Sequence, residues 1–371
     1  MKMTKVWLSS LLLLITSYCA NSTEQQKVEA ALQLYIDGTS FSQPDKINDA
    51  FYTDANLFLS HKEKPVWIVP VQEYTSWFNK VGRKTGRIGN ILAIDIQNDI
   101  ATAKIEILHP QSQSRYIDLL LLKKLNNQWK IISKTATSTA GNNSGQRILF
   151  IVSNAHFHGD SQIPAGVSFG EIVNAYDVFT QAGYTVDFVS PEGGAIPLSY
   201  VNTSEKLHKQ YLYDTDFMYA IGHTHTPADI DPSQYAAVQY IGGSNAMYGV
   251  ANNEAIQRIA MAVYEQHNGI ISSVCHGTAG IVHLKTSDGN YLVKDKRITG
   301  YPDSFENPDK AYFKEFPFLI QKTTEAHGGN FYHSPRNNAH VEVDGRIVTG
   351  QNFLSSAPVA LKIIELIESQ G

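Results

Sequence analysis

Two kinds of hydrophobic pattern divide the chain, and the first covers residues 23–136. Apolar residues recur at helical spacing from Val28 to Tyr35, Ser22 and Gln25 suit a capping box, and Gly38 ends the helix. A second short helix and four alternating strands follow, at residues 47–51, 94–96, 101–107, 116–125 and 129–133. Helices first and an antiparallel meander after them predict an α+β domain.

The second pattern begins after a short polar stretch. Residues 137–146 belong to a run of small and polar residues without an apolar period, so we predict a linker there. Beyond it, apolar strands alternate with amphipathic helices, the strands at 147–153, 184–190, 236–241 and 270–274 and the helices at 171–182 and 256–264. This alternation predicts an α/β domain over residues 147–371, with a parallel sheet between helix layers and a site at the carboxyl ends of its strands.

The first 22 residues have the features of an export signal. Lys2 and Lys5 precede an apolar run, residues 6–15, that is too short to span a membrane in the mature protein. Cleavage after Ser22 satisfies the small-x-small rule, and lipidation at Cys19 is the alternative. We therefore expect a periplasmic or secreted protein with no stable membrane span after removal of residues 1–22.

Composition and cysteine count narrow the functional classes. With 371 residues, a formal net charge of −5 and 43% hydrophobic residues, the chain suits a globular two-domain protein and shows nothing that suggests nucleic-acid binding. Its two cysteines are Cys19 and Cys275, so we expect no disulfide within the mature chain. An unpaired thiol kept in an oxidising compartment is better explained by chemistry than by packing.

Cys275 itself lies in a sequence typical of a nucleophile elbow. The strand at 270–274 runs straight into Cys275, and the elbow needs small residues two positions before and after the nucleophile, which Ser273 and Gly277 supply. A helix beginning here would lower the thiol pKa and favour the thiolate. The backbone N–H of His276 can hold an oxyanion and its ring can move protons. A buried core cysteine is the alternative interpretation.

A second backbone donor is expected from Gly242-Gly243, which ends the preceding strand. Without a Cβ, Gly243 lets a substrate approach its N–H, and together with the N–H of His276 it would complete an oxyanion hole. An ordinary turn at the end of a strand is the alternative.

Residues 146–366 resemble the PfpI family of the class I glutamine amidotransferase-like superfamily, which also holds the Parkinsonism-associated protein deglycase and the heat-shock glyoxalase III chaperones. The resemblance rests on the opening strand, the Gly-Tyr-Thr-Val-Asp-Phe-Val-Ser-Pro strand, the Val-Cys-His-Gly elbow, Ile298-Thr299-Gly300-Tyr301 and residues 344–352. It implies a flavodoxin-like parallel sheet.

The resemblance also implies roles for particular residues. Glu171 occupies the place of the glutamate that points at the cysteine, and His276 that of the catalytic histidine. Glu306 matches the acid that orients this histidine, with Asp303 as its rival. Many relatives carry Gly-Gly-His-Gly where this chain has Ser244 after the two glycines. Because this histidine is missing, the resemblance does not by itself assign the relatives' substrate to this protein.

Residues 23–136 resemble the nuclear-transport-factor-2-like fold, within it the lumazine-binding and SnoaL-like group, through the order of their elements alone. The resemblance implies a cone-like α+β domain with a ligand pocket or a homodimer surface. His61, Trp67, Tyr74 and Trp77 are candidates to line the pocket, and core aromatic residues are the alternative.

Metal binding and a lid are two further hypotheses. His156 and His158 follow the first strand of the second domain, and His223 and His225 lie before the third, but paired histidines in loops have no fixed geometry. We therefore predict no metal and no other cofactor. The segment 193–231 is long enough to cover the site.

The sequence thus predicts a cysteine-dependent enzyme acting on a small carbonyl compound or a carbonyl adduct, with Cys275, His276, Glu306 and Glu171 in its site. An amidase or peptidase would use the same groups. A ligand-binding or redox-sensing module with a non-catalytic Cys275 is the alternative outside the enzymes, and a holdase chaperone is a third possibility.

Overall fold

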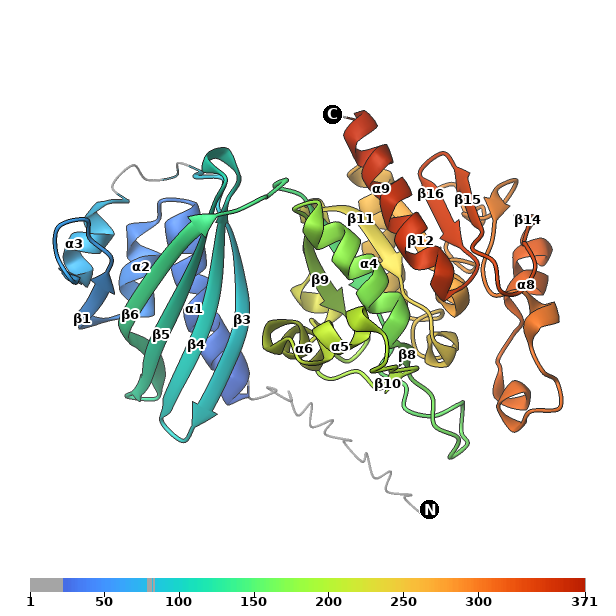
Figure 1. Ribbon diagram of the computed structural model, residues 1–371, viewed down its shortest axis with the longest axis horizontal. Helices are drawn as coiled ribbons and strands as arrows, with labels where there is room; N and C mark the ends of the chain where they lie inside the picture. Colours follow the sequence, from blue (N-terminus) through green and yellow to red (C-terminus); the bar gives the residue numbers. More distant parts are fainter. Residues whose placement is uncertain (1–22, 79–81, 83, 371) are drawn as a thin grey trace, which may run out of the picture.

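The computed structural model describes residues 23–78, 82 and 84–370 (Figure 1). The predicted export signal, with Cys19 and Ser22, lies outside the described residues. Helix α1 (Glu24–Ser40) has its capping box at Thr23 and Gln26, one residue later than predicted. Among the described residues, no helix is long and apolar enough to cross a membrane.

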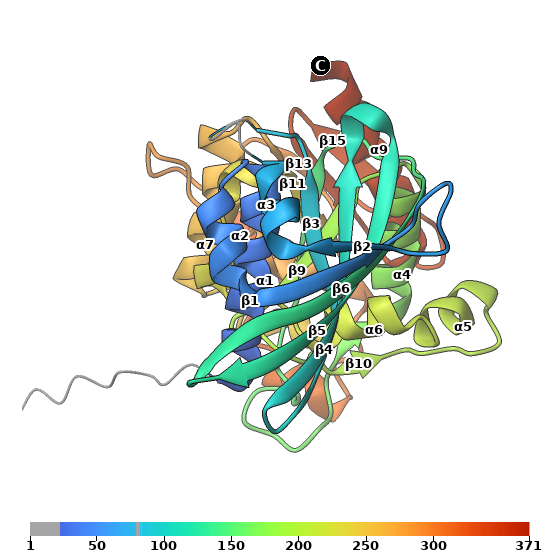
Figure 2. The same ribbon diagram turned by 90° about the vertical axis from the view of Figure 1, so that its left-hand side faces the viewer.

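The first domain is a curved six-stranded sheet with helices on one face (Figures 1 and 2). The strand order is β2-β1-β6-β5-β4-β3, and all neighbours are antiparallel except β1 and β6. Val28, Leu32 and Tyr35 of α1 are buried against the sheet, as their spacing predicts. The remaining elements are α2 (Pro44–Ala50), β1 (Phe51–Leu59), β2 (Trp67–Pro70), α3 (Val71–Ser76), β3 (Ile88–Gln97), β4 (Ile100–His109), β5 (Ser114–Leu125) and β6 (Gln128–Ala140).

Two features of this domain differ from the sequence pattern. β1 begins at Phe51, where the second helix was expected to end, and pairs with β2 on one side and β6 on the other. β6 continues to Ala140, so the first four residues of the expected linker are strand. Their small polar side chains give no apolar period, but their backbone pairs with residues 114–117 of β5.

The second domain contains a six-stranded sheet in the order β15-β16-β12-β11-β7-β9. Every pair is parallel except β15 and β16. The strands are β7 (Arg147–Ile151), β9 (Thr185–Val189), β11 (Tyr235–Tyr240), β12 (Ile270–Val274), β15 (Val341–Asp344) and β16 (Ile347–Gly350). Strands β7, β11, β12 and β16 are almost wholly buried, because helices cover both faces of a parallel sheet, whereas β9 and β15 at the two edges are less buried.

Helices α4 (Phe169–Gln181) and α9 (Ser356–Gln370) lie on one face of this sheet (Figure 1). Phe179 of α4 and Ile363 of α9 share one buried apolar cluster with Phe150 of β7. On the other face, Ile256 and Ile259 of α7 (Glu254–Met261) pack with Ile271. The carboxyl ends of β11 and β12 lie side by side, which places Gly243 and Cys275 at the same edge.

Much of the predicted lid, residues 193–231, forms strands and helices of its own. It contains β10 (Leu198–Ser199), which pairs with β8 (Val167–Ser168), and helices α5 (Lys206–Leu212) and α6 (Thr215–Gly222). Helix α6 packs against β3 of the first domain, and Lys104 Nζ on the neighbouring strand β4 lies 2.7 Å from Asp216 Oδ2 of α6. This part of the segment therefore joins the two domains.

Candidate active site

The turn after β12 has the backbone geometry of a nucleophile elbow. Cys275 adopts φ +57°, a conformation that a side chain with a Cβ rarely takes and that is common at functional sites. A Cβ on Gly277 would lie 2.3 Å from the carbonyl oxygen of Tyr240, so only glycine fits there. Ser273 is fully buried and bonds Thr278 through their hydroxyls, 2.9 Å apart. The requirement for a small residue two positions after Cys275 is confirmed.

His276 connects the thiol to a carboxylate. Its Nδ1 lies 3.4 Å from Cys275 Sγ, and its Nε2 lies 2.8 Å from Glu306 Oε1. Because a carboxylate accepts a hydrogen bond from Nε2–H, Nδ1 presents its lone pair to the sulfur. The ring stacks on Tyr301, with centroids 4.4 Å apart. The arrangement can therefore take a proton from the thiol and stabilise the resulting imidazolium.

Asp303, the rival orienting acid, has a different place. Its two carboxylate oxygens accept the backbone N–H groups of Gln321 and Lys322, each at 3.0 Å, in the first turn of α8 (Ile320–Ala326). These bonds satisfy N–H groups that a helix start leaves unpaired. Of the two candidate acids, Glu306 is the one in contact with His276.

Glu171 approaches the sulfur from the first turn of α4. Its Oε2 accepts the backbone N–H of Gly242 at 2.9 Å, and its side chain is hydrogen-bonded to Cys275. Burial raises the pKa of this carboxyl from 4.5 to about 8. At neutral pH the group is therefore a neutral acid that can donate to sulfur.

The expected low pKa of the thiol is not found. Burial raises the pKa of Cys275 well above its ordinary range, and charge on Glu171 adds to the rise, although the backbone N–H of His276 acts in the opposite direction. The predicted helix is a 3₁₀ segment, Cys275–Gly280, too short and irregular to supply a strong helix field. The structure therefore favours a protonated thiol beside a base over a resting thiolate.

Gly243 follows β11 at the same edge and adopts φ +114°. A Cβ there would lie 2.4 Å from both the carbonyl oxygen of Gly166 and the backbone nitrogen of Ser168. Among the described residues its N–H has no hydrogen-bond acceptor, whereas that of Gly242 is taken by Glu171. The Gly243 N–H is thus available as an oxyanion donor.

Aromatic residues that sequence reasoning missed surround this centre. Tyr312 places its hydroxyl 3.5 Å from Glu306 Oε2, and Phe316 packs on His276. Tyr200, just after β10, adopts φ +59°, and burial, with a smaller contribution from charge on Cys275, raises the pKa of its hydroxyl. The density of aromatic residues between 301 and 318 was the available signal for the first two.

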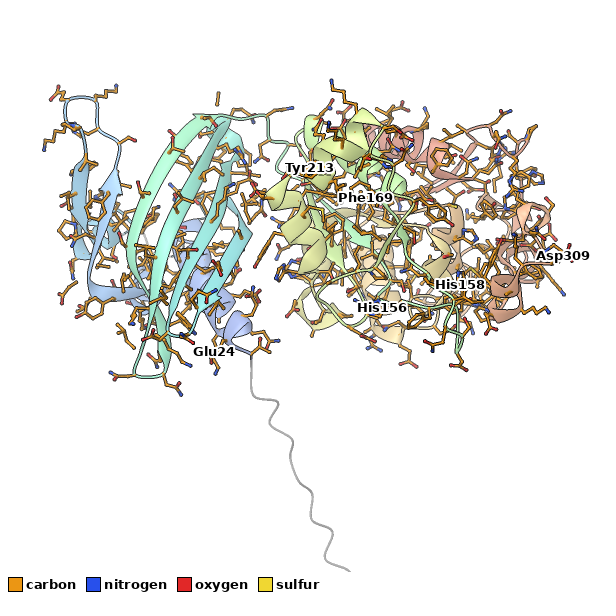
Figure 3. The ribbon with its side chains drawn as sticks, turned by 60° about the horizontal axis from the view of Figure 1, so that its bottom comes forward. Glu24, His156, His158, Phe169, Tyr213 and Asp309 are labelled. Carbon is orange, nitrogen blue, oxygen red and sulfur yellow. The ribbon has the colours of Figure 1, made fainter. Side chains whose placement is uncertain are left out.

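The four histidines of the metal hypothesis have separate surroundings. His158 packs beside Tyr248, Tyr312 and Phe316, and Figure 3 shows it with His156 on the loop after β7. His223 stacks on Tyr219 of α6. The described part of the chain holds no group of three or more His, Cys, Asp or Glu side chains placed to bind a metal ion.

The aromatic candidates of the first domain lie together. Trp67 packs on His61 and Trp77, with centroids 5.8 and 5.4 Å apart, and Trp77 packs on Tyr74. The groove of about 590 Å³ in this domain lies elsewhere, on β3–β6 and β1, and none of the four lines it.

Comparison with known proteins identifies the family of the second domain. A family model described as the DJ-1/PfpI family matches residues 163–366, more than half of the chain. The chain belongs to the DJ-1/PfpI family. A second model, described as "Putative lumazine-binding", matches residues 23–136, and the nuclear-transport-factor-2-like prediction for the first domain is confirmed with it.

Relatives of this DJ-1/PfpI protein include named glyoxalases. Glyoxalase 3 of Candida albicans is 28% identical over 231 residues, which cover 58% of this chain and 94% of that protein. Glutathione-independent glyoxalase hsp3102 of Schizosaccharomyces pombe is 27% identical over 236 residues, 58% of this chain and 95% of the relative.

Solved structures share the fold of the second domain. Rapid Encystment Protein 24 KDa of Francisella tularensis aligns with a TM-score of 0.57 at 23% identity, over 60% of this chain and 99% of that one. Glyoxalase III of Candida albicans aligns with a TM-score of 0.55 at 24% identity, over 60% and 97%.

Proposed function

We propose that the protein is a glutathione-independent glyoxalase that converts a 2-oxoaldehyde and water into a 2-hydroxycarboxylic acid at Cys275. The observation that carries this is the contact of one thiol with both His276 Nδ1 and Glu171, with Glu306 on the far nitrogen of the ring. The glyoxalase relatives supply the substrate class.

The first step forms a hemithioacetal. His276 Nδ1 takes the thiol proton as sulfur bonds to the aldehyde carbon, and Glu306 stabilises the imidazolium. Neutral Glu171 donates a hydrogen bond to sulfur as it gains negative charge, which offsets the effect of burial on the thiol pKa. The N–H groups of Gly243 and His276 hold the former aldehyde oxygen.

The second step moves hydrogen between neighbouring carbons. After protonating the oxyanion, the His276 ring removes the proton from the sulfur-bearing carbon, and the electron pair forms an enediolate with the adjacent ketone. Reprotonation at the ketone carbon then gives a 2-hydroxy thioester. The aldehyde carbon is oxidised and the ketone carbon reduced, so no external oxidant is needed. Water cleaves the thioester and returns the thiol.

Turnover without glutathione tests this function. Methylglyoxal incubated with the protein should yield lactate in equal amount, and Cys275→Ala should reduce the rate to the uncatalysed level. Release of ammonia from amides with no lactate from methylglyoxal would favour the amidase alternative instead. A reactive Cys275 with neither activity would favour the sensing module.

We also propose that the protein is exported, because Lys2, Lys5 and the apolar run after them resemble a secretory signal. The mass of the protein isolated from its native cells should correspond to a chain beginning at Thr23. A mass that retains residues 1–22 would contradict export with cleavage, and a lipidated Cys19 would support the anchored alternative.

A further inference from the structure

A well-fixed loop presents an arginine beside the candidate active site. The loop before β15 is held by Gln351 and Asn352, which are 0% and 5% exposed. The side-chain amide of Asn352 donates to the carbonyl oxygen of Arg336 at 3.1 Å and to that of Asn338 at 2.8 Å. The amide of Gln351 donates to Asn338 as well, at 3.2 Å. The position of the Arg336 backbone is therefore set by buried side chains.

The Arg336 guanidinium reaches the ring that covers His276. It donates to the Tyr301 hydroxyl at 2.9 Å and lies 5.7 Å from the centre of the Phe305 ring. Tyr301 in turn stacks on His276 at 4.4 Å. A single phenol thus separates the guanidinium from the imidazole that contacts the Cys275 sulfur.

The charge of Arg336 is not neutralised by the part of the protein that the structure describes. No described carboxylate lies within ion-pair distance of it, and Tyr301 takes one of its five N–H groups. The two acids of this region are engaged elsewhere, since Glu306 bonds His276 and Asp303 bonds the start of α8. The guanidinium is exposed to solvent and keeps donors for a further partner.

We propose that Arg336 binds an anionic group of the substrate, so that the site prefers 2-oxoaldehydes that carry a carboxylate over neutral ones. A guanidinium pairs with a carboxylate through two parallel N–H···O bonds, which gives both affinity and orientation. The choice of oxoaldehydes rests on the proposed function, whereas anion binding beside Cys275 does not.

Alkylation of Cys275 tests anion binding without any turnover. Iodoacetate and iodoacetamide alkylate the same sulfur and differ in one charge. The ratio of their alkylation rates, measured on the peptide containing Cys275, therefore reports the charge at the site. Arg336→Gln should lower the iodoacetate to iodoacetamide ratio roughly tenfold, while Arg336→Lys should retain part of it. Arg258→Gln, on the exposed face of α7, removes the same charge and should leave the ratio unchanged. An unchanged ratio in Arg336→Gln would overturn the proposal.

Kinetics with paired substrates tests specificity and separates the two proposals. Arg336→Gln should lower kcat/KM for 4,5-dioxopentanoate by roughly 10- to 100-fold, through KM, and change that for methylglyoxal less than twofold. Equal losses for both substrates would show a structural role through Tyr301 and overturn the specificity claim. If the wild type converts neither substrate, the proposed function fails, and the alkylation ratio alone decides whether Arg336 binds anions.

Discussion

The buried carboxyl of Glu171 makes the stability of the second domain depend on pH. Its pKa is about 8 in the folded protein and near 4.5 when exposed, so the folded state holds one more proton between these values. The contribution of this group to the free energy of unfolding is fully present below pH 4.5 and decreases as pH rises toward 8. Above pH 8 it does not change further. Glu171→Gln keeps a donor and an acceptor without ionising.

We therefore expect Glu171→Gln to gain stability relative to the wild type as pH rises from 5 to 8. Urea unfolding of the second domain at several pH values measures this difference. A difference that does not change with pH would mean that Glu171 is ionised in the folded state.

Glu306 and Asp303 provide a matched pair for the role of the His276 contact. Glu306→Gln removes the carboxylate that fixes the ring tautomer, so we expect kcat to fall roughly 100-fold or more. Asp303→Asn removes a helix-start contact and should cost about 1 kcal/mol of stability with kcat little changed. Equal effects of the two substitutions on kcat would contradict the assignment of Glu306.

At the level of structural elements, the turns after β11 and β12, which carry Gly243 and Cys275, require other backbone segments to pass close to their glycines. Gly243→Ala places a Cβ against the backbone of Gly166 and Ser168 in a conformation that glycine alone adopts readily. It should destabilise the second domain by about 3 kcal/mol or more. Gly289→Ala, at φ +82° in open space, is the control and should cost about 1 kcal/mol. Similar losses in urea unfolding for both would mean that the β11 turn can relax.

The strands that position the site could be predicted because burial on both faces makes their sequences mostly apolar. Ile270 to Val274 and Tyr235 to Tyr240 are examples. The elbow could be predicted for a second reason, since Ser273 and Gly277 occupy fixed offsets from Cys275. The 3₁₀ form of Cys275–Gly280 could not, because small residues suit an α-helix start equally well.

The contacts that bring the residues around the site together could not be predicted from the sequence. Tyr312 and His158 meet at a ring distance of 5.3 Å although 154 residues of sequence, the difference of their numbers, separate them. Arg336 lies in a loop without any period, and its role depends on Tyr301 and on the two buried amides of Gln351 and Asn352. Such contacts follow from the folded topology and leave no local pattern.

At the level of the whole molecule, the two domains have different relations to the site. The first domain contacts the second through polar groups, among them Lys104 with Asp216 and the Gln25 amide with the Tyr219 hydroxyl at 2.8 Å. The groups around Cys275 all come from the second domain. The order of elements predicted both folds, but it held no information on how α6 would dock against β3.

The central claim is that Cys275 forms the covalent intermediate, and mass spectrometry of the quenched reaction tests it most directly. During turnover of methylglyoxal, the peptide containing Cys275 should gain the mass of one oxoaldehyde, and the gain should disappear when substrate is exhausted. Full turnover with an unmodified Cys275 peptide, or by Cys275→Ala, would contradict the account.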